Sequence, residues 1–221
     1  MQQLFSLTRG AFRNVENALS PGRLSRYMHE ARQDPHTALR LYLWNVRLCE
    51  SAYLACQVAE VSYRNAVHQV LRTRYPGWWV DRNRFIPQLP KRLRDELDRV
   101  VKDVIKNHSA DPEDYVVSGL SLGFWLHMTS KSFRKNLFVS ASPLLCRSLP
   151  AGLGVDDVYD AVDKLRNFRN RIAHHKPIFD RNPDSHVRRA KEIVSWFDGD
   201  TYWLVEQICR FNGTYASKPS V

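Results

Sequence analysis

The chain has 221 residues, with 33 Lys or Arg against 23 Asp or Glu, and its formal net charge is +10. An apolar fraction of 43% is enough to close a hydrophobic core, which excludes disorder for most of the chain. The longest uncharged stretch, residues 116–130, is shorter than the ~20 apolar residues of a membrane-spanning helix, so no membrane partner is expected. The first six residues lack the pattern of a secretory signal, and a cytoplasmic location is expected.

The excess of positive charge favours a polyanion as partner. The four cysteines contain no C-x-x-C pair and lie among apolar residues, so we expect reduced thiols, with neither a disulfide nor a bound metal. These positions are Cys49, Cys56, Cys146 and Cys209.

A long amphipathic helix is predicted from Asp34-Pro35 to a point before Pro76-Gly77. Its apolar residues recur at steps of three and four, and the seam is interrupted by the carboxylate of Glu60. The seam consists of Leu39, Tyr42, Val46, Cys49, Tyr53, Cys56, Tyr63, Val67 and Val70.

The rest of the chain also indicates helices. Residues 90–108 predict a charged helix with a stripe of Leu93, Leu97, Val100, Val101, Val104 and Ile105, and residues 116–126 form an apolar block that is expected to be buried. In that block Gly119 and Gly123 are expected to let neighbouring backbones approach closely. Breaks are expected at Ser142-Pro143 and Leu149-Pro150. A helix is then predicted from about Val155 to His175, capped near Asp156-Asp157 and ended by Pro177, followed by helices over 185–196 and 201–211.

These elements predict one all-α domain, a helical bundle over residues 1–221 with peripheral tails at 1–20 and 214–221. The tryptophans are expected mainly in the core, at positions 44, 78, 79, 125, 196 and 203. Trp78-Trp79 is expected to be a packed turn, with a base-stacking platform as the alternative.

More than half of the excess charge lies in residues 163–191, which hold nine Lys or Arg against three Asp, a net of +6. Within this segment lie Arg169, Asn170, His174 and His175. A solvated basic helix face explains the charges, but it does not explain two consecutive histidines.

A cationic cradle that contains histidine suits the cleavage of RNA by its own 2′-hydroxyl. Arginine can hold the extra negative charge of the transition state, and histidine can move a proton near neutral pH. A metal-dependent nuclease would need a convergent set of carboxylates, for which this segment offers only Asp163, Asp180 and Asp184. No cofactor or metal is therefore expected.

Residues 169–174, Arg-Asn-Arg-Ile-Ala-His, match the Arg-x4-6-His signature, and the wider chain resembles the Abi-like branch of the HEPN superfamily of helical ribonucleases. The resemblance spans roughly residues 24–180, with Leu122 at a position where Phe is common. Its ordered blocks are Leu24–Tyr27, Ala38–Asn45, Glu60–Val67, Leu120–Trp125 and Leu165–His175.

The resemblance implies a HEPN-type bundle with additional helices and a metal-independent endoribonuclease, an abortive-infection or toxin–antitoxin-type toxin. Such proteins usually form homodimers, and their antitoxin is a protein or a small non-coding RNA. Arg169 and His174 would be the catalytic pair, with Asn170 shaping the site. Candidate phosphate-binding residues beside them are Arg166, Arg171, His175 and Lys176. For His175, a helix-end role is the alternative, and for Arg166 a surface position.

Helical geometry places Arg169 and His174 about 140° apart, so one helix face cannot present both. Asn170 and His174, four residues apart, do share a face. Either the last helical turn loosens before Pro177 or a second copy of the chain completes a composite site. The dimer is the favoured interpretation.

A second cluster, on the long helix, consists of Glu60, Arg64, Asn65 and His68. A carboxylate on an apolar seam needs a partner. Glu60 is expected to form an ion pair that locks this helix to its neighbours, and the alternative is that the cluster orients Arg169 or His174.

Two other functions stay open at this point. One is an inactive helical adaptor that binds RNA or a partner protein, and the other is a DNA-binding protein.

Overall fold

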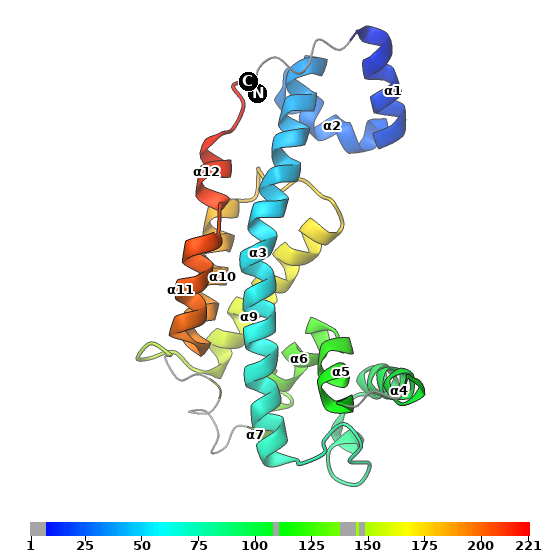
Figure 1. Cartoon of the computed structure of the whole chain (residues 1–221), viewed down its shortest axis with the longest axis vertical. Coiled ribbons are helices and arrows are strands. Elements are labelled where there is room, and N and C mark those ends of the chain that lie inside the picture. The colour runs from blue at the N-terminus through cyan, green and yellow to red at the C-terminus, as the bar shows by residue number, and fades with distance from the viewer. Residues whose placement is uncertain (1–7, 108–110, 138–144, 146–148) are drawn as a thin grey trace.

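The computed structural model describes residues 8–107, 111–137, 145 and 149–221, and every regular element in these residues is a helix, which confirms the all-α prediction (Figure 1). The elements are α1 (Arg9–Leu19), α2 (Pro21–Glu30), α3 (Pro35–Arg74), the 3-10 helix η1 (Ile86–Gln88), α4 (Lys91–Lys106), α5 (Pro112–Gly119), α6 (Leu122–Thr129), α7 (Arg134–Leu137), α9 (Val155–Ala173), α10 (Pro183–Phe197), α11 (Gly199–Ile208) and α12 (Phe211–Ala216).

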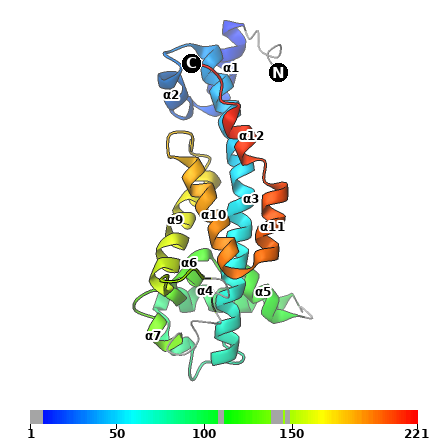
Figure 2. The same ribbon diagram turned by 90° about the vertical axis from the view of Figure 1, so that its left-hand side faces the viewer.

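The long helix α3 is the axis of the molecule. Its start is fixed by Asp34, whose side chain accepts a hydrogen bond from the backbone N–H of Thr37 at 2.8 Å, and by Pro35 at the first helical position. It ends at Arg74, so both predicted boundaries are confirmed. Helices α1 and α2 lie at one end of α3, α4 to α7 at the other end, and α9 to α12 alongside it (Figures 1 and 2).

The buried face of α3 differs in part from the predicted seam. Val46 is 46% exposed and Tyr53 39% exposed, whereas Leu41 and Leu48 are fully buried. The reason is that α2, α9, α10 and α12 all pack on α3, so burial follows several partners rather than one stripe. Small residues on the buried faces, Ala52, Ala55 and Ala59, let these helices approach closely.

The apolar block over residues 116–126 forms two helices rather than one. The chain turns at Leu120, and the hydroxyl of Ser121 caps α6 by accepting a hydrogen bond from the N–H of Phe124 at 3.2 Å. Gly119 lies so close to α4 that a Cβ atom there would be 2.8 Å from Cγ1 of Val100, which confirms the expected close approach at this glycine. Of the predicted stripe of α4, Leu93, Leu97, Val101 and Val104 are buried and Val100 is partly buried, whereas Ile105 at its end is 59% exposed.

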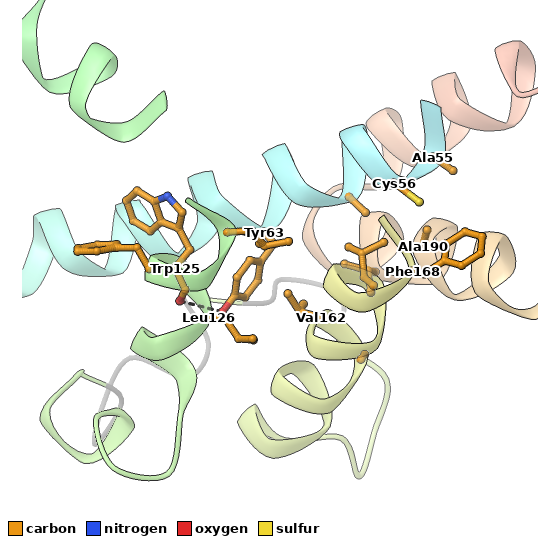
Figure 3. Close-up of a cluster of buried hydrophobic side chains, with 14 of the residues drawn as sticks. Ala55, Cys56, Tyr63, Trp125, Leu126, Val162, Phe168 and Ala190 are labelled. Carbon is orange, nitrogen blue, oxygen red and sulfur yellow. Dashed lines mark hydrogen bonds between the residues drawn. The ribbon is translucent and has the colours of Figure 1, made fainter. Parts of the chain in front are cut away.

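The core continues where α6 meets α3 and α9 (Figure 3). The hydroxyl of the fully buried Tyr63 lies 2.7 Å from Oγ1 of Thr129 and donates to the carbonyl of Trp125 at 3.1 Å.

Trp78 is fully buried against Trp125, which favours the packed turn over a stacking platform at this residue. Trp203 is 63% exposed on α11, so its expected place in the core was wrong.

The final helices return along α3. Helix α9 begins where the N–H of Gly154 donates to Oδ2 of Asp157 at 2.8 Å, close to the predicted cap. The expected tail at 214–221 is partly helical and is attached to the bundle. Its Thr214 carbonyl accepts a hydrogen bond from Trp44 at 2.8 Å, and Lys218 pairs with Glu30 at 3.6 Å. Residues 9–19, also expected as a tail, form α1.

Cys49, Cys56 and Cys209 carry free thiols. His108, Cys146 and the break at Ser142-Pro143 lie outside the described residues. Over the described part of the chain, no helix is both long and apolar enough to cross a membrane.

Candidate nucleic-acid interface

The segment with the Arg-x4-His motif ends α9 in a Schellman turn. The N–H of His175 donates to the carbonyl of Ile172 at 2.8 Å, and the N–H of Lys176 donates to that of Arg171 at 3.0 Å. His174 is the C-cap residue, and His175 adopts the left-handed conformation with φ 55° that this turn requires. The helix therefore ends two residues before the predicted His175, and the turn leaves the side chain of His174 exposed to solvent.

A groove of about 530 Å³ lies beside this turn. It brings together Asn170, His174 and four cationic side chains, and none of the described residues that line it is acidic. The full lining is Lys164, Asn167, Phe168, Asn170, Arg171, His174, Lys176, Arg181 and His186.

Arg169 does not line this groove but points to α3. Its Nη2 donates to Oε1 of Glu60 at 3.2 Å, and its Nε lies 3.1 Å from Oε2 of the same carboxylate. Nη1 of Arg169 also donates to Oδ1 of Asn170 at 3.3 Å. The ion pair between α3 and α9 explains the carboxylate on the seam of α3, and the arginine links it to Asn170 at the edge of the groove.

Two of the candidate phosphate-binding residues lie elsewhere. Arg166 donates to Asp163 at 2.6 Å and is not among the groove residues. His175 lines a second, mainly apolar hollow with Tyr27 and Tyr42, and its carbonyl accepts a hydrogen bond from Arg23 at 2.7 Å. Arg171 and Lys176 do line the groove with His174, as the sequence predicted them to lie together.

Of the four residues in the cluster on α3, only Glu60 forms a hydrogen bond or ion pair with a residue of the Arg-x4-His motif, namely Arg169. Burial lowers the pKa of Arg64, although the nearby Glu60 opposes this shift. Asn65 is exposed. His68 is buried at the far end of α3, where its Nδ1 accepts from Trp78 at 3.3 Å, and burial lowers its pKa. The cluster predicted from i, i+4 spacing therefore does not act as one unit on Arg169.

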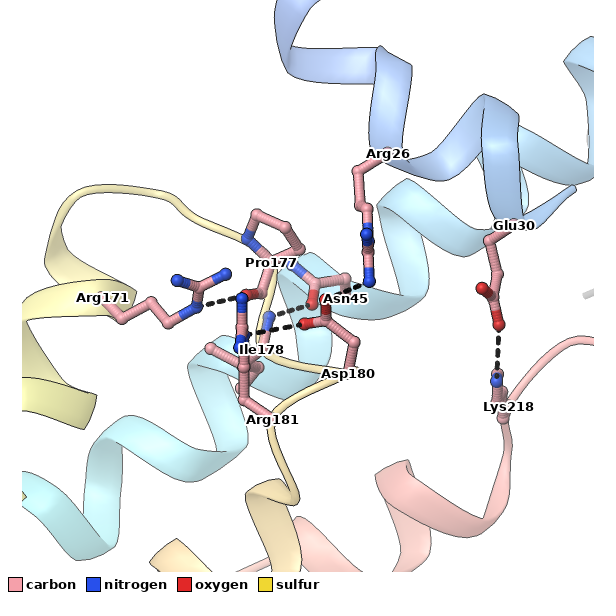
Figure 4. A network of polar contacts seen from close by, with 9 residues as sticks. All are labelled: Arg26, Glu30, Asn45, Arg171, Pro177, Ile178, Asp180, Arg181 and Lys218. Atoms are coloured by element: carbon pink, nitrogen blue, oxygen red, sulfur yellow. Dashed lines mark hydrogen bonds and ion pairs between the residues drawn. The ribbon is translucent and has the colours of Figure 1, made fainter.

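The chain between α9 and α10 is fixed by contacts with distant segments (Figure 4). The N–H of Ile178 donates to the buried amide oxygen of Asn45 at 2.9 Å, and Asp180 pairs with Arg26 at 2.7 Å. Nε of Arg171 donates to the carbonyl of Pro177 at 2.7 Å, which uses only one of the nitrogens of this guanidinium. The segment that joins the two walls of the groove is thus held in place.

The acidic residues of the basic segment are each paired. Asp163 accepts from Arg166, Asp184 pairs with Arg188 at 2.5 Å, and Asp180 pairs with Arg26. Within the described ranges, no three His, Cys, Asp or Glu side chains gather as a metal ion would require. The groove therefore presents cations, imidazoles and amides, a donor set suited to phosphate oxygens.

Sequence reasoning missed Lys164, Asn167, Arg181 and His186 as members of the site. Arg181 and His186 reach the groove because the chain reverses between α9 and α10, which no helical periodicity reveals. Lys164 lies three residues before Asn167, which in turn lies three residues before Asn170 and four before Arg171, so the helical spacing of α9 was the signal that could have identified them.

A scan of the chain against protein-family models finds no match, and searches among curated proteins and solved structures find none either.

Replacing His175 with Gly is expected to raise the free energy of unfolding by about 1 kcal/mol, because glycine adopts the left-handed conformation without the strain of a Cβ atom. Denaturant unfolding measures the change. The same substitution at His29, in the last turn of α2, is the control and should lower stability by about 1 kcal/mol. Equal losses in both variants would contradict the role given to His175.

Replacing Glu60 with Gln is expected to lower the free energy of unfolding by about 1–3 kcal/mol, because the half-buried guanidinium of Arg169 loses its counter-charge. Glu192, whose pair with Arg189 is more exposed, offers the matched control: Glu192→Gln should change stability by about 0–1 kcal/mol. Urea titrations of both variants at neutral pH make the comparison, and equal effects would show that the α3–α9 pair has no special role.

Proposed function

We propose that the chain is a metal-independent endoribonuclease of the HEPN type, which cleaves RNA at the groove between α9 and α10. The observation that carries the proposal is this groove, where His174 and Asn170 lie among Lys164, Arg171, Lys176 and Arg181. Cations of this number hold the phosphates of the RNA backbone, and the exposed imidazole of His174 is in a position to transfer a proton.

In the proposed reaction, the 2′-oxygen of a ribose loses its proton and attacks the adjacent phosphorus atom. The bond from phosphorus to the 5′-oxygen breaks, and the 5′-oxygen takes up a proton. The products are a 2′,3′-cyclic phosphate and a 5′-hydroxyl, and the groove cations stabilise the extra negative charge of the transition state.

Arg169 enters this proposal as a positioning residue rather than as a group that touches phosphate. It is held by Glu60 and donates to Asn170, so it fixes the amide that faces the groove. This assignment also removes the sequence-based reason for a composite site, because Arg169 and His174 no longer need to meet at one phosphate.

The engagement of Arg169 with Glu60 favours one second candidate, an adaptor that binds RNA without cleaving it. In such an adaptor the arginine would serve only the fold, and the cationic groove would supply affinity. Binding of RNA without any cleavage would identify this function.

The His174→Ala variant is expected to cleave RNA at least about 100-fold more slowly than the unmodified chain, because it loses a proton-transferring group. Purified protein is incubated with total RNA in EDTA, and the ends of the fragments are analysed. His29→Ala, which alters an exposed histidine on α2, is the control and should keep full activity with an unchanged thermal unfolding curve. The proposal is wrong if EDTA stops cleavage or if His174→Ala remains fully active.

The resemblance further leads us to propose a homodimer and a protein or RNA antitoxin as partners. The expected mass in solution is that of two chains, and light scattering after size-exclusion chromatography measures it. A mass of one chain at every concentration would contradict the homodimer while leaving the groove of each chain complete.

A further inference from the structure

His186 is a second histidine of the groove that the reaction above does not yet use. It lies in the first turn of α10, a helix that begins at Pro183 directly after the left-handed Asn182. Its ring stacks on that of Phe168, with 4.4 Å between the ring centroids and an interplanar angle of 9°. Because Phe168 is only 3% exposed and packs in the core, it gives the imidazole a rigid support.

The two histidines approach one groove from two helices. His174 caps α9 and His186 belongs to α10, and both line the same hollow with its four cations. The intervening segment is anchored by the bond from Ile178 to Asn45 and by the pair of Asp180 with Arg26. The fold therefore fixes the backbone positions from which the two imidazoles reach the groove.

We propose that His186 is the second proton-transferring residue of the groove and that it acts together with His174 of the same chain. This proposal rests on the proposed ribonuclease function. His186 takes the proton from the 2′-hydroxyl as the 2′-oxygen bonds to phosphorus, and His174 donates a proton to the departing 5′-oxygen. One proton enters the protein and one leaves it, so the pair returns to its starting state after proton exchange with water.

The surroundings of His186 support its role as the base. Its ring is half-buried on Phe168, and burial together with the nearby Lys164 lowers its pKa. The other titratable groups that line the groove are also cationic or imidazole: Arg171, His174, Lys176 and Arg181. A lowered pKa keeps the imidazole neutral at neutral pH, as a base requires, whereas His174 is exposed to water and can regain its proton after each turnover.

The test replaces His186 with Phe, which keeps an aromatic ring on Phe168 but removes the nitrogen atoms. Cleavage is expected to fall at least about 100-fold. The affinity for an oligonucleotide with a 2′-deoxy linkage at the cleavage site, which cannot react, should stay within twofold. His127→Phe is the matched control, because His127 is also half-buried, lies against Phe133 and has a pKa lowered by burial, but lies outside the groove. It should cleave within twofold of the unmodified chain.

A substrate with sulfur in place of the 5′-oxygen separates the two roles, because a thiolate leaves without taking up a proton. His174→Ala should regain most of its lost rate on this substrate, and His186→Phe should not. The pH profile gives a second readout: cleavage by the unmodified chain should fall as the pH drops below the pKa of His186, and this acidic limb should be absent from the His186→Phe variant.

The outcomes separate this inference from the proposed function. If the unmodified chain cleaves RNA and His186→Phe cleaves equally well, or loses binding in parallel with cleavage, His186 is not the base and the ribonuclease function stands. If the unmodified chain cleaves no RNA, the proposed function fails and the inference fails with it. Should His186→Phe not fold, His186→Gln provides the same test with a polar side chain.

Discussion

The ion pair between Glu60 and Arg169 is the contact on which the arrangement of the groove depends. It joins the middle of α3 to the last turns of α9, and both side chains are more than half shielded from water. With Arg169 facing α3, Asn170 is held at the edge of the groove through its bond to the same guanidinium. The nearby Cys56 shows how apolar the surroundings are, since burial, with a smaller effect from Glu60, raises the pKa of its thiol to about 12. This half-buried pair, together with the apolar face that α9 buries, thus determines which residues of α9 face the groove.

The positive charges of the basic segment, residues 163–191, are of two kinds. Arg166 and Arg169 are neutralised by carboxylates and serve the fold. Of the four groove cations, Arg181 lies 3.7 Å from Asp180, a carboxylate that also pairs with Arg26. Lys164, Arg171 and Lys176 have no ion pair with a carboxylate among the described residues, so the field of these three extends into the solvent. The excess charge counted from the sequence therefore overstates the positive charge that is available to a polyanion. Only the structure shows which arginines face the groove rather than a carboxylate of the fold.

Local signals in the sequence were enough to place most helices. Asp34-Pro35 and Pro76-Gly77 bounded α3, because caps and prolines act within one helical turn. Pro177 indicated the end of α9 only approximately, because the helix already stops at Ala173, in the turn made by the left-handed His175. The uncharged block over 116–126 had no periodicity, so the break before Ser121 was hidden. The exposure of Val46 and Tyr53 was equally hidden, because it depends on which helices pack on α3. Within the site, the sequence found His174, Asn170, Arg171 and Lys176, whereas His186 and Arg181 needed the chain reversal after α9.

The contacts that build the groove join parts of the chain that are synthesised far apart in time. Glu60 and Arg169 are 109 positions apart, and Asn45 and Ile178 are 133 positions apart. On the ribosome, α3 emerges long before α9 and α10, and the groove lacks at least one of its walls until both of these helices have left the exit tunnel. A nascent chain therefore exposes no complete groove to the messenger and ribosomal RNA around it until α10 has left the exit tunnel.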